Sequence, residues 1–108
     1  MATRQSTVDF ILDQITDAGT VHARKMFGEY GIFCDGKMVA LVCDDQLFVK
    51  PTAAGRQRLG EGVIERAPYP GAKPCFLVAG DRWEDRAWLA DLLRASCAEL
   101  PPPKSSRA

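Results

Sequence analysis

The chain has 108 residues, 46% of them hydrophobic and 26% charged, with 14 Lys and Arg balanced by 14 Asp and Glu. Its length suits a single domain, and its composition is too apolar for a disordered chain and too polar for a membrane protein. The zero net charge provides no overall field that would attract a polyanion, which argues against a typical nucleic-acid-binding domain.

Residues 6–18 are predicted to form an amphipathic helix. Apolar residues recur there at the spacing of one helix face, at Val8, Ile11, Leu12, Ile15 and Ala18. Ser6 and Asp9 resemble a capping box at its start, and Gly19 can adopt the left-handed conformation that ends a helix. Phe10 lies outside the apolar face, so we expect it to be exposed, or else packed beneath a neighbouring loop or subunit.

Consecutive antiparallel strands are predicted next. Short runs rich in β-branched and aromatic residues occupy 21–27, 30–34, 38–43 and 46–50. The dipeptide Asp35-Gly36 favours a tight type I′ hairpin, and Asp44-Asp45 marks the following turn. The run 38–43 is apolar at nearly every position, so both faces of that strand should be covered. A helix layer can cover one face, and we expect a curled sheet, the C-terminal tail or a second copy of the chain to cover the other.

The second half of the chain predicts two more helices and two more strands. A short helix capped by Thr52 should end near Leu59, because Gly60 and Gly62 follow. The prolines and glycine between residues 63 and 73 limit that segment to an edge strand near 67–69.

Residues 75–78 are predicted to form a further strand, and Asp85 to cap a last helix. The buried face of that helix should include Trp88, Leu89, Leu92, Leu93, Ser96 and Leu100. Three prolines from Pro101 then stop the helix, so residues 1–100 form the expected domain and 101–108 a flexible tail. The order α-β(4)-α-β(2)-α predicts an α+β fold with helices on one face of an antiparallel sheet.

The residue types that carry most chemistry are sparse. The four cysteines, Cys34, Cys43, Cys75 and Cys97, are far apart and form no CxxC pair, so we interpret them as small buried hydrophobic residues and expect no metal site or disulfide framework. His22 is the single histidine, and the sequence contains no GxSxG turn, phosphate loop or dinucleotide motif. We therefore predict no catalytic residue and no cofactor.

The same absence of signals bears on location. The longest mainly apolar run is shorter than a membrane span requires, and the polar N-terminus lacks the apolar region of a signal peptide. We expect a cytoplasmic protein without a membrane partner.

Residues 24–52, RKMFGEYGIFCDGKMVALVCDDQLFVKPT, resemble the signature of the TfoX N-terminal domain family, also called the Sxy or competence-regulator family. The resemblance combines an Arg-Lys-Met-Phe-Gly lead, a Tyr-Gly-Ile-Phe strand, an Asp-Gly hairpin, an apolar strand and a Leu-Phe-Val-Lys strand. It extends from about Ser6 to Leu100. It implies a two-layer fold similar to secretion-chaperone-like domains, with a curved antiparallel sheet against helices. Longer members are positive regulators of DNA-uptake genes that cooperate with a transcription factor and carry a second, C-terminal domain.

Residues 24–31 are the most unusual segment, with two cations, two aromatic residues and two glycines around an expected strand break. We predict an interaction surface formed by Arg24, Lys25, Phe27, Gly28, Tyr30, Gly31 and Lys50. In the alternative interpretation, the aromatic residues belong to the core, the glycines shape the sheet and the cations are only solvated.

Three functional hypotheses follow. The first is a TfoX-like regulatory module that acts through protein contacts in a transcriptional apparatus, in one version as a homodimer. The second is direct nucleic-acid binding, for which the candidate cations are Arg24, Lys25, Lys37, Lys50, Arg56 and Arg58. The third is a small-molecule or enzymatic role in a pocket between the sheet and its helices, near Tyr30 and Lys50.

Overall fold

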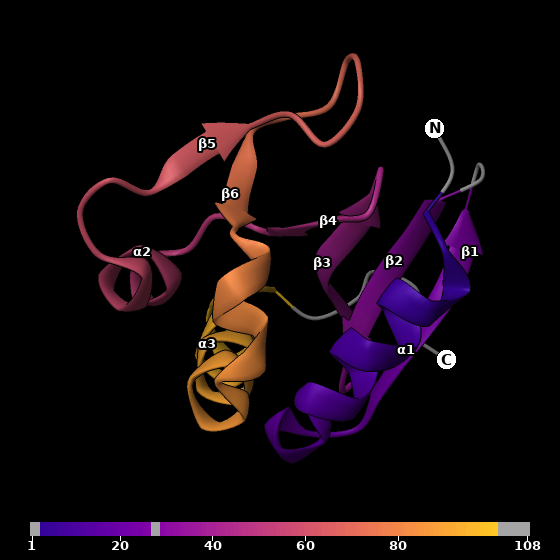
Figure 1. Cartoon of the computed structure of the whole chain (residues 1–108). Coiled ribbons are helices and arrows are strands. Elements are labelled where there is room, and N and C mark those ends of the chain that lie inside the picture. Colours follow the sequence, from indigo (N-terminus) through magenta and orange to yellow (C-terminus); the bar gives the residue numbers. More distant parts are fainter. Residues whose placement is uncertain (1–2, 27–28, 102–108) are drawn as a thin grey trace.

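The computed structural model describes residues 3–26 and 29–101, and it packs helices against a six-stranded antiparallel sheet (Figure 1). The helices are α1 (Gln5–Gln14), α2 (Ala53–Leu59) and α3 (Arg86–Glu99), with 3-10 segments η1 (Thr16–Ala18) and η2 (Gly80–Glu84). The strands are β1 (Val21–Met26), β2 (Glu29–Cys34), β3 (Lys37–Cys43), β4 (Gln46–Val49), β5 (Ile64–Arg66) and β6 (Cys75–Val78). The strand order β1-β2-β3-β4-β6-β5 confirms the predicted α+β fold with a curved sheet.

The main core lies between α1, α3 and one face of the sheet, as the positions of these helices in Figure 1 indicate. Its fully buried members include Val8, Ile11, Ile32, Val42, Leu47, Leu89, Leu92 and Leu93. Each such side chain stabilises the fold by about 1.5 to 3 kcal/mol when it leaves water. Phe10 is 42% exposed on α1, which confirms that it lies outside this core.

The predicted hairpin turns are confirmed by their backbone angles. Asp35 and Gly36 have φ of 52° and 85°, as a type I′ turn requires at both central positions. Asp44 and Asp45 also have positive φ, 54° and 58°. Aspartate tolerates this region better than most residues, so the second turn forms without a glycine.

The start of the first helix differs from the prediction, because Ser6 does not cap it. Arg4 is the N-cap residue and has no capping side-chain bond of its own. Instead, one carboxylate oxygen of Asp45 accepts hydrogen bonds from the Arg4 N–H and the Thr7 hydroxyl, each at 2.9 Å. These bonds lower the pKa of Asp45. The β3–β4 turn therefore supplies the acceptor that we expected from the helix itself.

The end of the first helix is also shorter than predicted. The α-helix stops at Gln14, and the 3-10 segment η1 completes the stretch to Ala18. Gly19 follows with φ of 152° and ψ of −156°, a conformation specific to glycine rather than the left-handed helical one. A side chain there would place a Cβ 2.9 Å from the Asp35 carboxylate oxygens, so glycine is also required by space.

Both predicted caps of the later helices are confirmed. The Thr52 hydroxyl accepts from the Gly55 N–H at 2.9 Å, and the Asp85 carboxylate accepts from the Trp88 N–H at 3.1 Å. No helix in the described part of the chain is long and apolar enough to cross a membrane.

The edge strand predicted at 67–69 is wrong, since β5 occupies Ile64–Arg66 and pairs with β6. Pro68 and Pro70 have no N–H to contribute to a ladder, so pairing ends before them. The following residues form a loop closed by a hydrogen bond from the Ala72 N–H to the Tyr69 carbonyl, at 3.1 Å. This loop carries Tyr69 toward the sheet face described below.

Candidate interaction site on the open face of the sheet

The face of the sheet turned away from the main core is called the open face here. Side chains alternate between faces along a strand, and directly paired residues of neighbouring strands share a face. The pairings place these residues on the open face: His22, Arg24, Met26, Glu29, Gly31, Phe33, Met38, Leu41, Cys43, Gln46, Phe48, Ile64, Arg66, Cys75 and Leu77.

Part of the open face forms a second, smaller apolar cluster. Cys43, Phe48 and Cys75 are 2%, 2% and 6% exposed, and Leu41 and Leu77 pack against them. The second face of β3 is thus buried at Cys43 by side chains of the neighbouring strands, whereas Met38 and Leu41 on the same face are only partly buried. Of the three covers considered for this strand, the curled sheet accounts for the burial at Cys43, and residues 102–108 of the tail lie outside the described residues.

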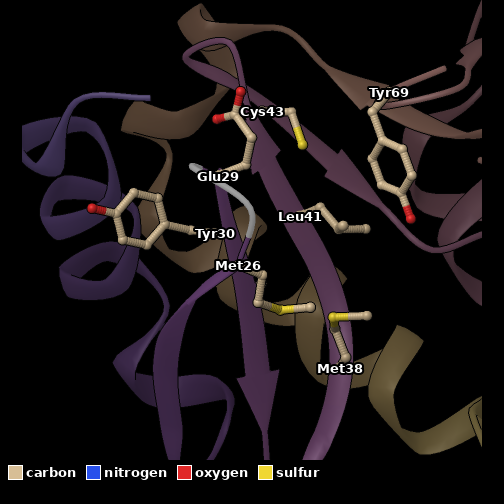
Figure 2. Close-up of a pocket in the computed structure, with 8 residues that line it drawn as sticks. Met26, Glu29, Tyr30, Met38, Leu41, Cys43 and Tyr69 are labelled. Carbon is tan, nitrogen blue, oxygen red and sulfur yellow. The ribbon is translucent and has the colours of Figure 1, made fainter. Parts of the chain in front are cut away.

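Beside this cluster the open face contains a hollow of about 310 Å³ (Figure 2). It is lined by Met26, Glu29, Tyr30, Gly31, Met38, Leu41, Cys43 and Tyr69. Figure 2 shows the thioethers of Met26 and Met38 converging at one end, with Tyr69 standing across from Leu41. Most of this lining is apolar, and Tyr69 remains 52% exposed. The hollow is therefore suited to an apolar group that arrives from outside.

Gly31 makes the methionine arrangement possible. A Cβ at this position would lie 2.8 Å from the Met38 sulfur and 3.0 Å from the Met26 sulfur, which is closer than van der Waals contact. Without a side chain, the strand lets both thioethers lie directly over its backbone. Methionine is flexible and polarizable, so such a lining can adapt to different apolar shapes.

A second hollow of about 260 Å³ adjoins the first, and Met38 lines both. Phe33 and Lys50 also line this second hollow. The ring of Phe33 is occupied by side chains of its own chain, because His22 stacks on it at a centroid distance of 5.1 Å and the Arg24 guanidinium lies 5.8 Å from its centroid.

The structure brings together only some of the predicted surface residues. Arg24 and Gly31 are cross-strand partners on the open face, and Lys50 borders the same face. Lys25 pairs with Tyr30 on the other face, and the Tyr30 hydroxyl donates to the Gln5 side chain at 2.9 Å. Tyr30 nevertheless borders the hollow, while its ring points toward α1 in Figure 2. The remaining two members, Phe27 and Gly28, lie outside the described residues.

Sequence reasoning missed the methionines, Leu41 and Tyr69. A register shift between Ile32 and Phe33 adds a residue on β3, which changes the face that each later side chain takes. Met26 and Met38, on either side of Gly31 in the sequence, could have indicated an apolar site. The position of Tyr69 could not be predicted, because it lies in a loop far along the chain from these strands. A pocket was expected between the sheet and its helices, near Tyr30 and Lys50. The first hollow does border Tyr30, but it lies on the opposite face of the sheet.

The cations proposed for nucleic-acid binding do not form one surface. Arg56 and Arg58 form ion pairs with Glu65 and Asp91, the second at 2.6 Å. The Lys37 ammonium donates to two carbonyls at the end of α3, both at 3.0 Å. Half of the candidate set is therefore engaged in the fold.

One cysteine cluster has a composition that could bind a metal. Ligand atoms of Cys34, Asp35 and Cys97 lie within 4.8 Å of one another. The Cys34 thiol donates to the Ala18 carbonyl at 3.6 Å, and the Cys97 thiol donates to the Cys34 carbonyl at 3.1 Å. Burial, followed by the neighbouring Cys97, raises the pKa of Cys34 to about 12. These contacts favour protonated thiols over metal-binding thiolates.

We expect the cysteines to resist alkylation in the folded protein. Burial raises the pKa of Cys43 to about 11, so at about pH 8, near the ordinary pKa of a free cysteine, Cys34 and Cys43 have almost no thiolate. Mass spectrometry after iodoacetamide treatment should show both unmodified until the chain is unfolded, when all four cysteines react. Rapid modification of Cys34 in the folded state would contradict the burial described here.

Comparison with known proteins supports the family resemblance. The model of the TfoX N-terminal domain matches residues 13–100. An uncharacterized 12.7 kDa protein in the trpE 5′ region of Spirochaeta aurantia is 42% identical over 108 residues, which cover 100% of this chain and 92% of that protein. The match includes the strands and the glycine that build the first hollow. Because it covers most of the sequence, the chain belongs to the TfoX N-terminal domain family.

Proposed function

We propose that this chain is a regulatory module that binds a protein partner of the transcriptional apparatus through the open face of its sheet. The observation that carries the proposal is the hollow of about 310 Å³, with its apolar lining and the exposed ring of Tyr69. Soluble domains seldom expose concave apolar surface without a binding role. Family membership supports the regulatory part, because longer relatives of this kind act on transcription. We place the module in the cytoplasm.

A binding role agrees with the chemistry of the hollow better than an enzymatic role does. Cys43 is the thiol in its lining, and desolvation together with nearby Glu29 raises its pKa to about 11. A nucleophile needs a lowered pKa or an adjacent base. His22, the single imidazole of the chain, instead stacks on Phe33. The proposal is therefore a module without catalytic activity.

Photocrosslinking in living cells tests this proposal. The photoreactive amino acid p-benzoylphenylalanine replaces Tyr69 in one variant and Phe10 in the other. Both positions hold aromatic side chains that are partly exposed, 52% for Tyr69 and 42% for Phe10. Each variant therefore replaces one aromatic ring with a similar one. We expect covalent products from position 69 that contain a subunit or regulator of transcription, and none of these from position 10.

The products also separate the alternatives. A product of twice the chain mass at position 69 would identify a second copy of the chain as the occupant. The proposal fails if position 69 gives no product, or if both positions give the same products.

A further inference from the structure

The cations of the open face form no ion pair with another residue of the described part of the chain. Within residues 3–26 and 29–101, the ion pairs are Arg4–Asp45, Arg56–Glu65, Arg58–Asp91, Arg86–Asp13 and Arg94–Asp91. Arg24, Lys50 and Arg66 take part in none of them. Arg24 comes from β1 at one edge of the sheet and Arg66 from β5 at the other, with Lys50 following β4 between them. Positive charge therefore borders the apolar centre of this face in a chain whose net charge is zero.

The carboxylate in the lining of the first hollow does not neutralise these cations. One oxygen of Glu29 accepts from the Thr3 N–H at 3.1 Å, from the Asp44 N–H at 3.3 Å and from the Thr3 hydroxyl. The charge of Glu29 is thus held at one end of the hollow by donors of the fold. Arg24 and Lys50 remain available to an arriving anion.

The arrangement suits an acidic peptide better than a nucleic acid. Single strands bind where bases can stack on free aromatic rings. On this face the Phe33 ring already carries His22 and lies close to Arg24, and Phe48 is buried, so Tyr69 is the one free ring among the described residues. The floor of the hollow is made of flexible thioethers and Leu41, which receive an aliphatic or aromatic side chain. Arg24 is the cross-strand partner of Gly31, and Lys50 lines the adjoining second hollow, so positive charge beside the first hollow would select acidic neighbours of that side chain.

We infer that the partner docks through an acidic segment that inserts one apolar side chain into the hollow while its carboxylates face Arg24 and Lys50. This inference rests on the proposed function and names the chemistry of the partner. The cations would mainly control the rate of association and the choice of partner, whereas the apolar side chain would set the lifetime of the complex.

Binding to the full chain can be measured with a fluorescein-labelled peptide in which a Leu-Phe pair is flanked on both sides by glutamates. Companion peptides carry lysines in place of the glutamates, or Ser-Ser in place of Leu-Phe. We expect only the glutamate peptide with the apolar pair to bind. The double variant Arg24→Glu, Lys50→Glu should weaken its affinity about tenfold or more. Lys25→Glu is the matched control, because Lys25 is exposed on β1 but paired with Tyr30 on the other face.

Three results would overturn the inference. The lysine peptide could bind as tightly, Lys25→Glu could weaken binding as much as the double variant, or labelled oligothymidine could bind in preference with a steep salt dependence. If the peptides show no preference for glutamate while crosslinks at position 69 persist, the partner is not acidic but the proposed function stands. Loss of those crosslinks would instead remove the proposed function itself.

Discussion

Replacing Phe48 with alanine is expected to lower the free energy of unfolding by about 3 to 5 kcal/mol, a cost typical of a buried phenylalanine. Phe48 is 2% exposed, yet it belongs to the open face and packs in the small cluster with Cys43 and Cys75. Because this cluster is a second packed core, removal of the Phe48 ring leaves a cavity that the surrounding strands cannot fill. Urea unfolding followed by tryptophan fluorescence measures the change.

Ile64→Ala is the matched control for this prediction. Ile64 lies on the same face but is 52% exposed, so its truncation should change stability by no more than about 0.5 kcal/mol. Equal effects of Phe48→Ala and Ile64→Ala would show that the open face is not packed as described, and the hollow beside the cluster would lose its support.

The second large effect is expected at Lys37. Its ammonium donates to the Cys97 and Leu100 carbonyls at 3.0 Å each, and so neutralises the negative end of α3. Lys37→Met keeps most of the aliphatic stem and removes the donor. The free energy of unfolding should fall by about 1.5 to 3 kcal/mol, the usual worth of a hydrogen bond to a charged group.

Lys25→Met provides the comparison, because Lys25 is exposed on β1. That substitution should change the unfolding free energy by less than about 0.5 kcal/mol. If chemical denaturation gives the same stability for both variants, Lys37 does not secure the end of α3 to the sheet.

Features set by neighbouring residues could be predicted from the sequence. The turn at Asp35-Gly36 and the caps at Thr52 and Asp85 follow from local backbone chemistry, and all three form as expected. The cap of α1 could not be found in this way. Its acceptor is Asp45, which is distant in sequence and reaches Arg4 only when the β3–β4 turn folds against the helix.

In the candidate site, too, some residues could be predicted from local sequence, and others are placed there only by the tertiary structure. Arg24 and Gly31 were predicted as site residues because the segment 24–31 combines cations, aromatic residues and glycines. Both lie on the open face. Lys25 was assigned to the same surface as Arg24, although consecutive strand residues point to opposite faces. Tyr69 gave no signal, because the loop that carries it is positioned by tertiary packing. Local chemistry thus indicated where the site begins, while strand register and loop placement decided its shape.

Methyl NMR of the chain labelled at methionine tests most directly whether binding takes place on the open face. The signals of Met26 and Met38 come from two side chains that converge over Gly31 in the hollow. On titration with the glutamate peptide, we expect both signals to shift and to saturate with one affinity, while amide signals of α2 and α3 stay in place. Unchanged methionine signals together with shifts in α2 or α3 would contradict the assignment of the open face as the binding surface.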